Sequence, residues 1–385
     1  MKAIAQRREA ATLEGLVDRV LCHDVRDGAG KIAVEKGARL TPASAKVLLD
    51  TPWEEIHLLV VEPNDLHEEE AGKRLAAVVV GDGVEVKGYT GGQWTLAATR
   101  RGLLKVRRQA LADVNALEGI SVFTLFDSQP VEPGETIGKC KVTPLVIPAD
   151  TIATVEKLAR AAHGLVTVHG FEPTTIGVVA QERLDAKQRA RFETALKQKV
   201  EWFGGRLLPI QYAGGSPRVV ADTLTALRRD GAEVLIVAGA SALDPLDPVF
   251  GGLTLLGARM ERHGAPAHPG SLLWLAIWDG KAVLGMPTCG MFSQATTFDL
   301  ALPQILAGER VDNRALAEMG HGGLLSRDMA YRFPPYKTNA ARGELERAPR
   351  RPPRQAAATA TSSGSGGASH GIAVRCRAPT RSPRT

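Results

Sequence analysis

Cysteine is scarce in this sequence, and its placement excludes two common kinds of small scaffold. Among the 385 residues the cysteines are Cys22, Cys140, Cys289 and Cys376. Because they are far apart and form no Cys-x-x-Cys pair, neither a zinc ribbon nor a disulfide framework is indicated. We expect reduced and mostly buried thiols. Aromatic residues are also few, at 5%, whereas the 40 glycines favour an α/β protein with close packing of helices on sheets.

Long apolar runs are absent as well. No run approaches the ~20 residues that are needed to cross a bilayer. The first residues, MKAIAQRREAATLEG, lack the apolar core of a secretory signal. The sequence therefore predicts a soluble, cytoplasmic protein that does not bind a membrane.

The positive charge of the chain is confined to its end. The formal net charge is +6. The stretch from Ala341 onward contains nine arginines against Glu344 and Glu346, which leaves 39 basic and 40 acidic side chains in the first 340 residues. A neutral body offers no basic stripe for a phosphate backbone, so we expect no nucleic-acid partner. The tail itself, 342–385, is rich in Pro, Arg, Ser, Gly and Ala and is predicted to be disordered.

Turn signals divide the remainder of the chain, whose length is typical of two or three domains. Residues 1–150 contain short branched or alternating runs separated by Gly-Asp-Gly, Gly-Gly and Glu-Pro-Gly turns, which predicts a β-rich module with hairpins. One helix is expected there after the cap residue Thr41, with Pro42 in its first turn. Residues 311–341 form a predicted C-terminal extension.

In residues 151–310, strand and helix candidates alternate along the sequence. A helix in ADTIATVEKLARAAHG precedes the apolar run TTIGVVAQ, the helix QRARFETALKQKVEWFGG and the strand candidate RLLPIQYAGG. A helix capped by Ser216 then precedes the run EVLIVAG, and the later run KAVLGMP leads into one long helix that contains Pro303. Strands separated by helices imply right-handed crossovers, so we predict an α/β domain with a mostly parallel sheet in three layers.

Two of these strands end in loops that are suited to a ligand. The run from Val234 ends at Gly239 and is followed by Asp244 and Asp247, each before a proline; the other loop is GMPTCG, at 285–290. Small residues let backbone N–H groups approach an oxyanion, and carboxylates suit Mg²⁺. Since ligands bind beyond the carboxyl ends of parallel strands, a phosphate–metal site is one interpretation. Ordinary turn chemistry is the other, and neither loop is a G-x-G-x-x-G or P-loop sequence.

The segment from about Thr175 to Glu309 resembles the molybdopterin-binding domain of molybdenum-cofactor biosynthesis proteins, and its chain order looks most like the molybdopterin molybdotransferase branch. TIGVVAQERL resembles the opening strand of that domain, and VLIVAGASALD resembles its strand ending in a Thr-Gly-Gly-x-Ser-x-Gly-type loop. APAHPGSLLWLAIWDGKAVLGMP resembles its Pro-Gly-Lys-Pro segment, and LGMPTCGMFSQATTFDLALPQIL resembles its Gly-Leu-Pro-Gly-Asn-Pro loop and the following helix. The resemblance implies that domain's fold behind a β-rich module.

Several positions depart from the family motifs. Ala240 replaces one glycine of the first loop, and Ser271 stands where the family has the lysine after Pro269-Gly270. Thr288-Cys289-Gly290 replace Gly-Asn-Pro, and the Met-Asp-Gly-Tyr-Ala segment of the family is missing from residues 1–150. These departures fall where the chemistry of the family would occur.

The resemblance also implies roles for individual residues. The cofactor-binding set that it implies is Gly239, Ala240, Ser241, Pro287, Thr288, Cys289 and Gly290. The catalytic set is Ser241, Asp244 and Asp247, in which Ser241 donates a hydrogen bond. Asp244, or Asp247 in its place, would bind Mg²⁺ together with Glu182 and so stabilise charge on phosphoryl oxygens. From the residues alone, Ser241 as a turn cap, Glu182 as a solvated residue and Cys289 as a small buried residue are the plain alternatives.

Two functions follow from the resemblance, and both include binding of molybdopterin or its adenylated form. The first is a transferase that inserts molybdate into adenylated molybdopterin with the help of Mg²⁺. The second is a carrier that hands the cofactor to a molybdoenzyme client without catalysing its formation. A doubly wound domain that has lost its ligand is a third alternative. The family precedent also implies a homodimer.

Overall fold

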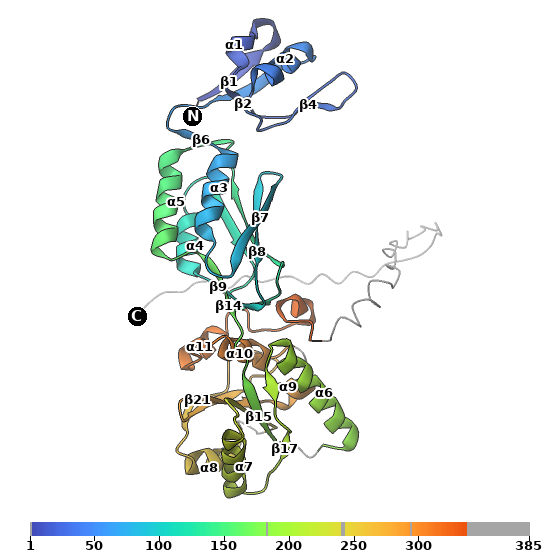
Figure 1. Ribbon diagram of the computed structural model, residues 1–385, viewed down its shortest axis with the longest axis vertical. Coiled ribbons are helices and arrows are strands. Elements are labelled where there is room, and N and C mark those ends of the chain that lie inside the picture. The colour runs from blue at the N-terminus through green and yellow to red at the C-terminus, as the bar shows by residue number, and fades with distance from the viewer. Residues whose placement is uncertain (1, 182–183, 240–242, 293–294, 337–385) are drawn as a thin grey trace, which may run out of the picture. The chain divides into compact units, whose positions relative to one another are not determined.

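The computed structural model describes residues 2–181, 184–239, 243–292 and 295–336 (Figure 1). These residues belong to one compact unit that spans residues 1–338. The tail that was predicted to be disordered, 342–385, lies outside the described residues. Within the described ranges, no helix is both long and apolar enough to cross a bilayer.

A small antiparallel sheet lies at the start of the chain. Its order is β1 (Lys2–Arg7), β5 (Glu55–Val60) and β2 (Arg19–Leu21). The expected helix is α2 (Pro42–Asp50), and it begins as predicted, because the Thr41 side chain accepts a hydrogen bond from the Ser44 N–H. The same part contains a 3-10 helix (Arg8–Ala10), α1 (Leu13–Leu16), β3 (Val25–Arg26) and β4 (Ile32–Val34).

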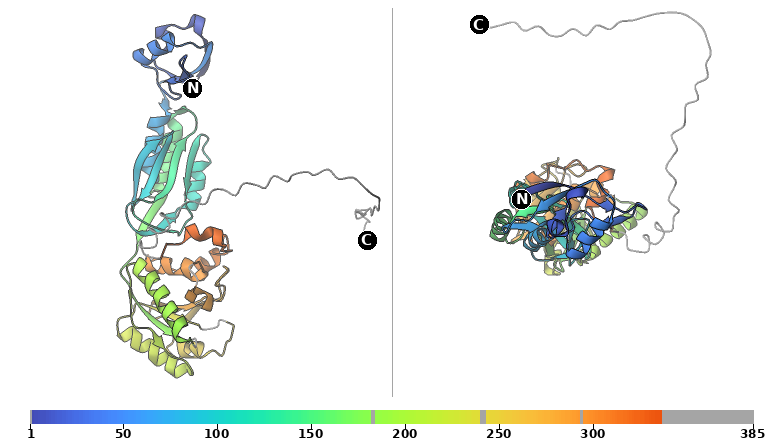
Figure 2. Two further views of the ribbon diagram at one scale, coloured as in Figure 1. Left: turned by 90° about the vertical axis from the view of Figure 1, so that its right-hand side faces the viewer. Right: turned by 90° about the horizontal axis from the view of Figure 1, so that it is seen from above.

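A four-stranded antiparallel sheet follows, with its strands side by side in the left view of Figure 2. Its order is β10 (Ile120–Thr124), β12 (Thr136–Val142), β8 (Gln93–Ala98) and β7 (Val84–Thr90). The last two strands form the expected hairpin, in which Gly91 and Gly92 both have positive φ. Around it lie α3 (Glu68–Val79), α4 (Arg108–Asn115), β9 (Gly102–Val106), β11 (Pro130–Val131), β14 (Val166–Gly170), β6 (Asp65–His67) and β13 (Val146–Pro148).

The helix expected after residue 150 is α5 (Ala149–Ala161), and it packs with the strands before it. Ile152, Val155 and Ala159 are buried in one core with residues of α3 and β12. The next strand, β14, pairs with β9 of the same part. The division of the chain at residue 150 stays a prediction, and this packing favours a boundary after Gly170 instead.

The largest sheet lies in the last part of the described chain and has seven strands. They are β15 (Thr175–Ala180), β16 (Arg206–Leu207), β17 (Gln211–Tyr212), β18 (Val234–Ala238), β19 (Arg259–His263), β20 (Trp274–Trp278) and β21 (Lys281–Met286). The order is β16-β15-β18-β21-β20-β19, with β17 also paired to β15. Pairs from β16 to β21 are parallel, whereas β20 and β19 are antiparallel.

The protein is thus α/β in the broad sense that helices and strands are mixed along it. Most of its sheets are small and antiparallel, and the largest sheet is mixed, with parallel pairs from β16 to β21 and antiparallel pairs of β20 with β21 and β19. A mostly parallel sheet in three layers stays a prediction. Asp279-Gly280, both with positive φ, join β20 and β21 as a tight hairpin, so the strands at this end of the sheet run antiparallel. A fold of the molybdopterin-binding type stays a prediction.

The central strands of this sheet are apolar on both faces, and each face has its own core. Ile236 and Leu284 pack with residues of α6 (Ala186–Trp202) and α10 (Thr297–Leu306). Their neighbours Val237 and Val283 pack with residues of α7 (Pro217–Arg229) and α8 (Pro248–Leu255). Because successive side chains of a strand point to opposite faces, helix cover on both sides explains why EVLIVAG shows no polar alternation.

The single helix expected after β21 is two helices. The first is α9 (Thr288–Phe292), and α10 begins a few residues later. A capping box formed by Thr296 and Asp299 starts the second helix, and Pro303 lies inside it. The last elements are α11 (Asn313–Glu318) and a 3-10 helix (Arg327–Arg332).

Candidate functional site

Three parallel strands end side by side at one edge of the largest sheet. Ala180 of β15 pairs with Ala238 of β18, which pairs with Met286 of β21. The connections between them begin with backbone bonds: the Gln181 N–H donates to the Ala238 carbonyl at 3.0 Å, and the Gly239 N–H donates to the Met286 carbonyl at 3.2 Å. The chain therefore leaves β18 and β21 at the same edge of the sheet.

The side on which the chain adds its next strand changes at this edge of the sheet. From β15 it passes through α6 to β16 and β17 on one side, and then through α7 to β18 on the other side of β15 (Figure 1). In open α/β sheets such a switch point leaves a crevice outside the carboxyl ends of the strands, and ligands bind there. The topology therefore favours a ligand site at the ends of β15 and β18.

The two aspartates of the first loop shape the loop itself. A carboxylate oxygen of Asp244 accepts a hydrogen bond from the Leu246 N–H at 2.9 Å. Asp247 is the N-cap of α8, and its carboxylate accepts from the Val249 N–H at 2.9 Å. These are turn and cap hydrogen bonds of the kind that Asp-Pro sequences favour. Both aspartates therefore have the ordinary turn chemistry that was the alternative to a ligand site. Their catalytic roles stay predictions.

The metal site that was predicted stays a prediction, because one of its two ligands lies outside the described residues. No group of three or more His, Cys, Asp or Glu side chains that could hold a metal ion occurs among them. Asp244 is exposed and uses one carboxylate oxygen within the loop. Glu182, Ala240 and Ser241 lie outside the described residues. We therefore derive no step through Mg²⁺.

The loop after β21 presents two side chains to solvent. Pro287 and Gly290 are buried, whereas Thr288 and Cys289 are exposed. Exposure of Cys289 corrects the expectation of a buried thiol, and it follows from the position of this residue in α9 at the sheet edge. The Gly290 N–H donates to the Pro287 carbonyl at 2.8 Å, so this amide and that of Gly239 are already used within the protein.

The Pro269-Gly270 segment packs against the start of α10. The Thr297 N–H donates to the Pro269 carbonyl at 2.9 Å, and the Thr297 hydroxyl donates to the Ala267 carbonyl at 2.9 Å. Gly270 has φ of +107°, and a Cβ there would lie 2.9 Å from the Thr297 nitrogen. The fold thus brings this segment, found by resemblance alone, to the helix that follows the second loop.

A buried polar network behind α10 was missed by the sequence analysis. The Lys199 ammonium donates to Oδ1 of Asp299 at 2.6 Å, and the Tyr336 hydroxyl donates to the same oxygen at 3.2 Å. The other carboxylate oxygen accepts from the Thr296 N–H and hydroxyl at 3.0 and 2.8 Å. Burial, with the Asp299 charge next, raises the pKa of Tyr336. The Thr296–Asp299 spacing is the signal that indicates Asp299, and the position of Lys199 three residues after Leu196, on the apolar face of α6, is the signal for the lysine.

A pocket of about 520 Å³ opens at the same sheet edge. It is lined by Ala180, Gln181, Leu184, Arg189, Tyr212, Ala213, Gly214 and Gly215. The Arg189 guanidinium lies 3.8 Å from the centre of the Tyr212 ring, and the Tyr212 hydroxyl donates to Glu193 at 2.8 Å. Burial and that hydrogen bond raise the pKa of Tyr212 to about 12. The pocket therefore combines a planar cation, an aromatic ring and glycine backbone.

Sequence reasoning did not find the Arg189–Tyr212 pair. The signal that could have found the pocket is Gly214-Gly215 after the strand candidate that became β17, since β17 pairs with β15 at Ala180. The arginine comes from α6, and its position over the ring depends on how that helix packs, which sequence spacing does not give.

Comparisons with known proteins give only distant similarity. No family model matches the chain, and no curated protein matches it. Among solved structures, the molybdopterin biosynthesis MoeA protein from Pyrococcus horikosii is 15% identical over 66% of this chain and 80% of that chain, with a TM-score of 0.25. A deletion mutant of NadC is 12% identical over 46% of this chain and 68% of that chain, with a TM-score of 0.15. TM-scores this low carry no information on the function of the chain.

Proposed function

We propose that this protein binds molybdopterin, or its adenylated form, at the carboxyl-terminal edge of the seven-stranded sheet. The observation that carries the proposal is the parallel pairing of β15, β18 and β21, which brings the starts of three loops, at Gln181, Gly239 and Pro287, to one edge. The sequence resemblance covers these three loops and supplies the identity of the ligand. A role in molybdenum-cofactor biosynthesis follows from that ligand.

The pocket beside β15 has the chemistry that a phosphorylated heterocycle needs. A guanidinium stacked on the ring of Tyr212 keeps its in-plane N–H donors for a phosphate oxygen, and such charge-assisted bonds are the strong ones. Gly214 and Gly215 allow the ligand to approach the backbone, because a Cβ at either glycine would meet no atom within 4 Å. We assign Arg189 to the phosphate and the exposed residues Thr288 and Cys289, at the start of α9, to the rest of the ligand.

Two functional forms of this proposal remain. The transferase form inserts molybdate into adenylated molybdopterin. The carrier form binds the cofactor and passes it to a molybdoenzyme client, and specific observations favour it. The carboxylates of Asp244 and Asp247 take part in a turn and a helix cap, and the amides of Gly239 and Gly290 are bonded within the protein. The homodimer, the client and a cytoplasmic location stay predictions.

One assay separates these forms. The full chain is mixed with adenylated molybdopterin, molybdate and Mg²⁺, and desalted, and the protein fraction is read for pterin fluorescence and the filtrate for AMP. We expect retained pterin in either form. AMP release identifies the transferase, and retained pterin without AMP identifies the carrier. Loss of all pterin on desalting, at protein concentrations well above micromolar, would refute the proposal.

A matched pair of variants tests whether the ligand binds at the proposed edge of the sheet. Arg189→Ala removes the cation beside Tyr212, and we expect at least about tenfold weaker pterin retention, as for loss of a charged hydrogen bond. Arg206→Ala is the control, because Arg206 pairs beside Thr175 at the opposite end of β15. Both arginines are exposed, so neither change should disturb folding. Equal retention by the two variants would place the ligand elsewhere.

A further inference from the structure

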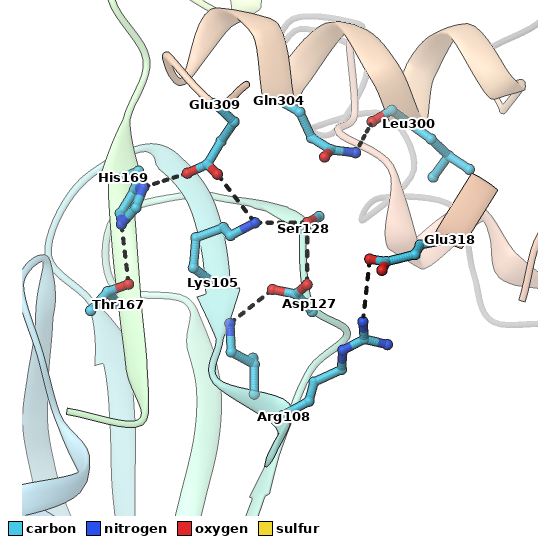
Figure 3. Close-up of polar contacts among 11 residues, drawn as sticks. Lys105, Arg108, Asp127, Ser128, Thr167, His169, Leu300, Gln304, Glu309 and Glu318 are labelled. Atoms are coloured by element: carbon cyan, nitrogen blue, oxygen red, sulfur yellow. Dashed lines mark hydrogen bonds and ion pairs between the residues drawn. The ribbon is translucent and has the colours of Figure 1, made fainter. Parts of the chain in front are cut away.

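A second pocket, of about 750 Å³, is lined by three cationic side chains and two carboxylates, and it shares no residue with the pocket at the sheet edge. It is lined by Lys105, Val106, Arg107, Arg108, Gln109, Ala110, Asp127, Thr167, His169 and Glu309. Lys105 lies in β9 and His169 in β14, and Arg108 is the first residue of α4 (Figure 3). Arg107 is the N-cap residue of that helix. Its volume is in the range of small-molecule sites.

One end of this pocket already holds a carboxylate. Oε1 of Glu309 lies 2.7 Å from Nδ1 of His169, and Oε2 lies 3.5 Å from the Lys105 ammonium (Figure 3). Asp127 also lines the pocket, and its carboxylate oxygens accept from the Val106 N–H at 2.8 Å and the Ser128 hydroxyl at 3.4 Å. At this end, the contacts of the Glu309 carboxylate with His169 and Lys105 show how the pocket can bind an oxyanion.

At the other end of the pocket, the two arginines make at most one long ion pair with a described carboxylate. Arg108 meets Glu318 only at 3.8 Å, and within the described ranges the Arg107 side chain has no ion pair. Both arginines are exposed. The first turn of α4 contains no acidic residue, and its N-cap residue, Arg107, provides no side-chain cap. The partial positive charge of those amides adds to that of the two guanidinium groups.

We propose that this pocket binds a small molecule carrying phosphate groups, with one phosphate held by Arg107, Arg108 and the first amides of α4. The proposal does not depend on the pterin site. Two arginines lining one pocket suit a phosphate because guanidinium groups present paired donors to its oxygens. Glu309 competes with the ligand for Lys105 and His169 at the far end.

Calorimetric titration of the full chain with pyrophosphate tests this site. The double variant Arg107→Ala/Arg108→Ala should bind pyrophosphate at least about tenfold more weakly, since it loses charged hydrogen bonds. Arg107→Lys/Arg108→Lys, which keeps the charge, should retain part of the affinity. Lys73→Ala is the matched control, because Lys73 is exposed on α3 and does not line the pocket. Equal affinity in the double variant and the control would overturn the proposal.

Hydrogen exchange then locates the ligand within the chain. Saturating pyrophosphate should slow exchange of the backbone amides at 108–110 in the unchanged protein and leave it unaffected in the double alanine variant. Glu309→Gln should tighten binding, because it removes the competing carboxylate. Protection confined to segments outside the pocket would show that pyrophosphate is held by other arginines of the chain, and that result also overturns the proposal.

Discussion

The ion pair between Lys199 and Asp299 joins α6 to the start of α10 in the core of the largest sheet. Both side chains are at most 2% exposed, and their charged atoms lie 2.6 Å apart. Replacing Lys199 by methionine keeps the volume but leaves the carboxylate buried without its cation. We expect Lys199→Met to lower the free energy of unfolding by about 3–5 kcal/mol, measured by urea denaturation.

A double variant separates the charge from the packing. Lys199→Met/Asp299→Asn removes both charges, and the asparagine oxygen can still accept from the Thr296 N–H that caps α10. We expect this variant to recover a large share of the stability lost in Lys199→Met. If the single lysine variant unfolds at the urea concentration of the unchanged protein, the pair contributes nothing and the capping box alone positions α10.

Residue-level sequence reasoning succeeded where the chemistry is local and failed where it is not. Asp-Pro sequences indicate turns and caps, and Asp244 and Asp247 are used in this way. Lys199 lies on the apolar face of α6, three residues after Leu196, so helical spacing indicates its burial. Its partner is 100 residues away and becomes visible only when the two helices are packed together.

Among the elements, β18, β21 and α7 could be predicted because each carries its own signal. The strands are uninterrupted apolar runs, and α7 begins with Ser216, whose side chain accepts from the Val219 N–H. The single helix expected after β21 was wrong, because apolar periodicity continues across a break set by the Thr296–Asp299 capping box. The core to which α5 belongs depends on long-range contacts that periodicity does not encode.

Gly270 tests how the Pro269-Gly270 segment is joined to α10. A Cβ at this position would lie 2.9 Å from the Thr297 backbone nitrogen, and φ of +107° disfavours any other residue. We expect Gly270→Ala to lower the free energy of unfolding by about 1–3 kcal/mol. Gly28→Ala is the control, since a Cβ there would meet nothing within 4 Å and φ lies outside the left-handed region. A change as small as that of the control would mean that the segment shifts freely away from α10.

At the scale of the whole molecule, charge is divided between a neutral body and an arginine-rich end. A chain that stops at Ala341 loses nine arginines and two glutamates, and its net charge falls from +6 to −1. We expect the full chain to be retained on heparin at low salt and the shortened chain to pass through, because retention by a polyanion follows the number of neutralising cations. The free energy of unfolding and the pyrophosphate affinity should be the same in both chains, since the pocket begun by Arg107 and Arg108 is intact. Equal heparin retention would instead place the polyanion-binding surface on the body, and a parallel loss of pyrophosphate affinity would move the phosphate site to the removed arginines.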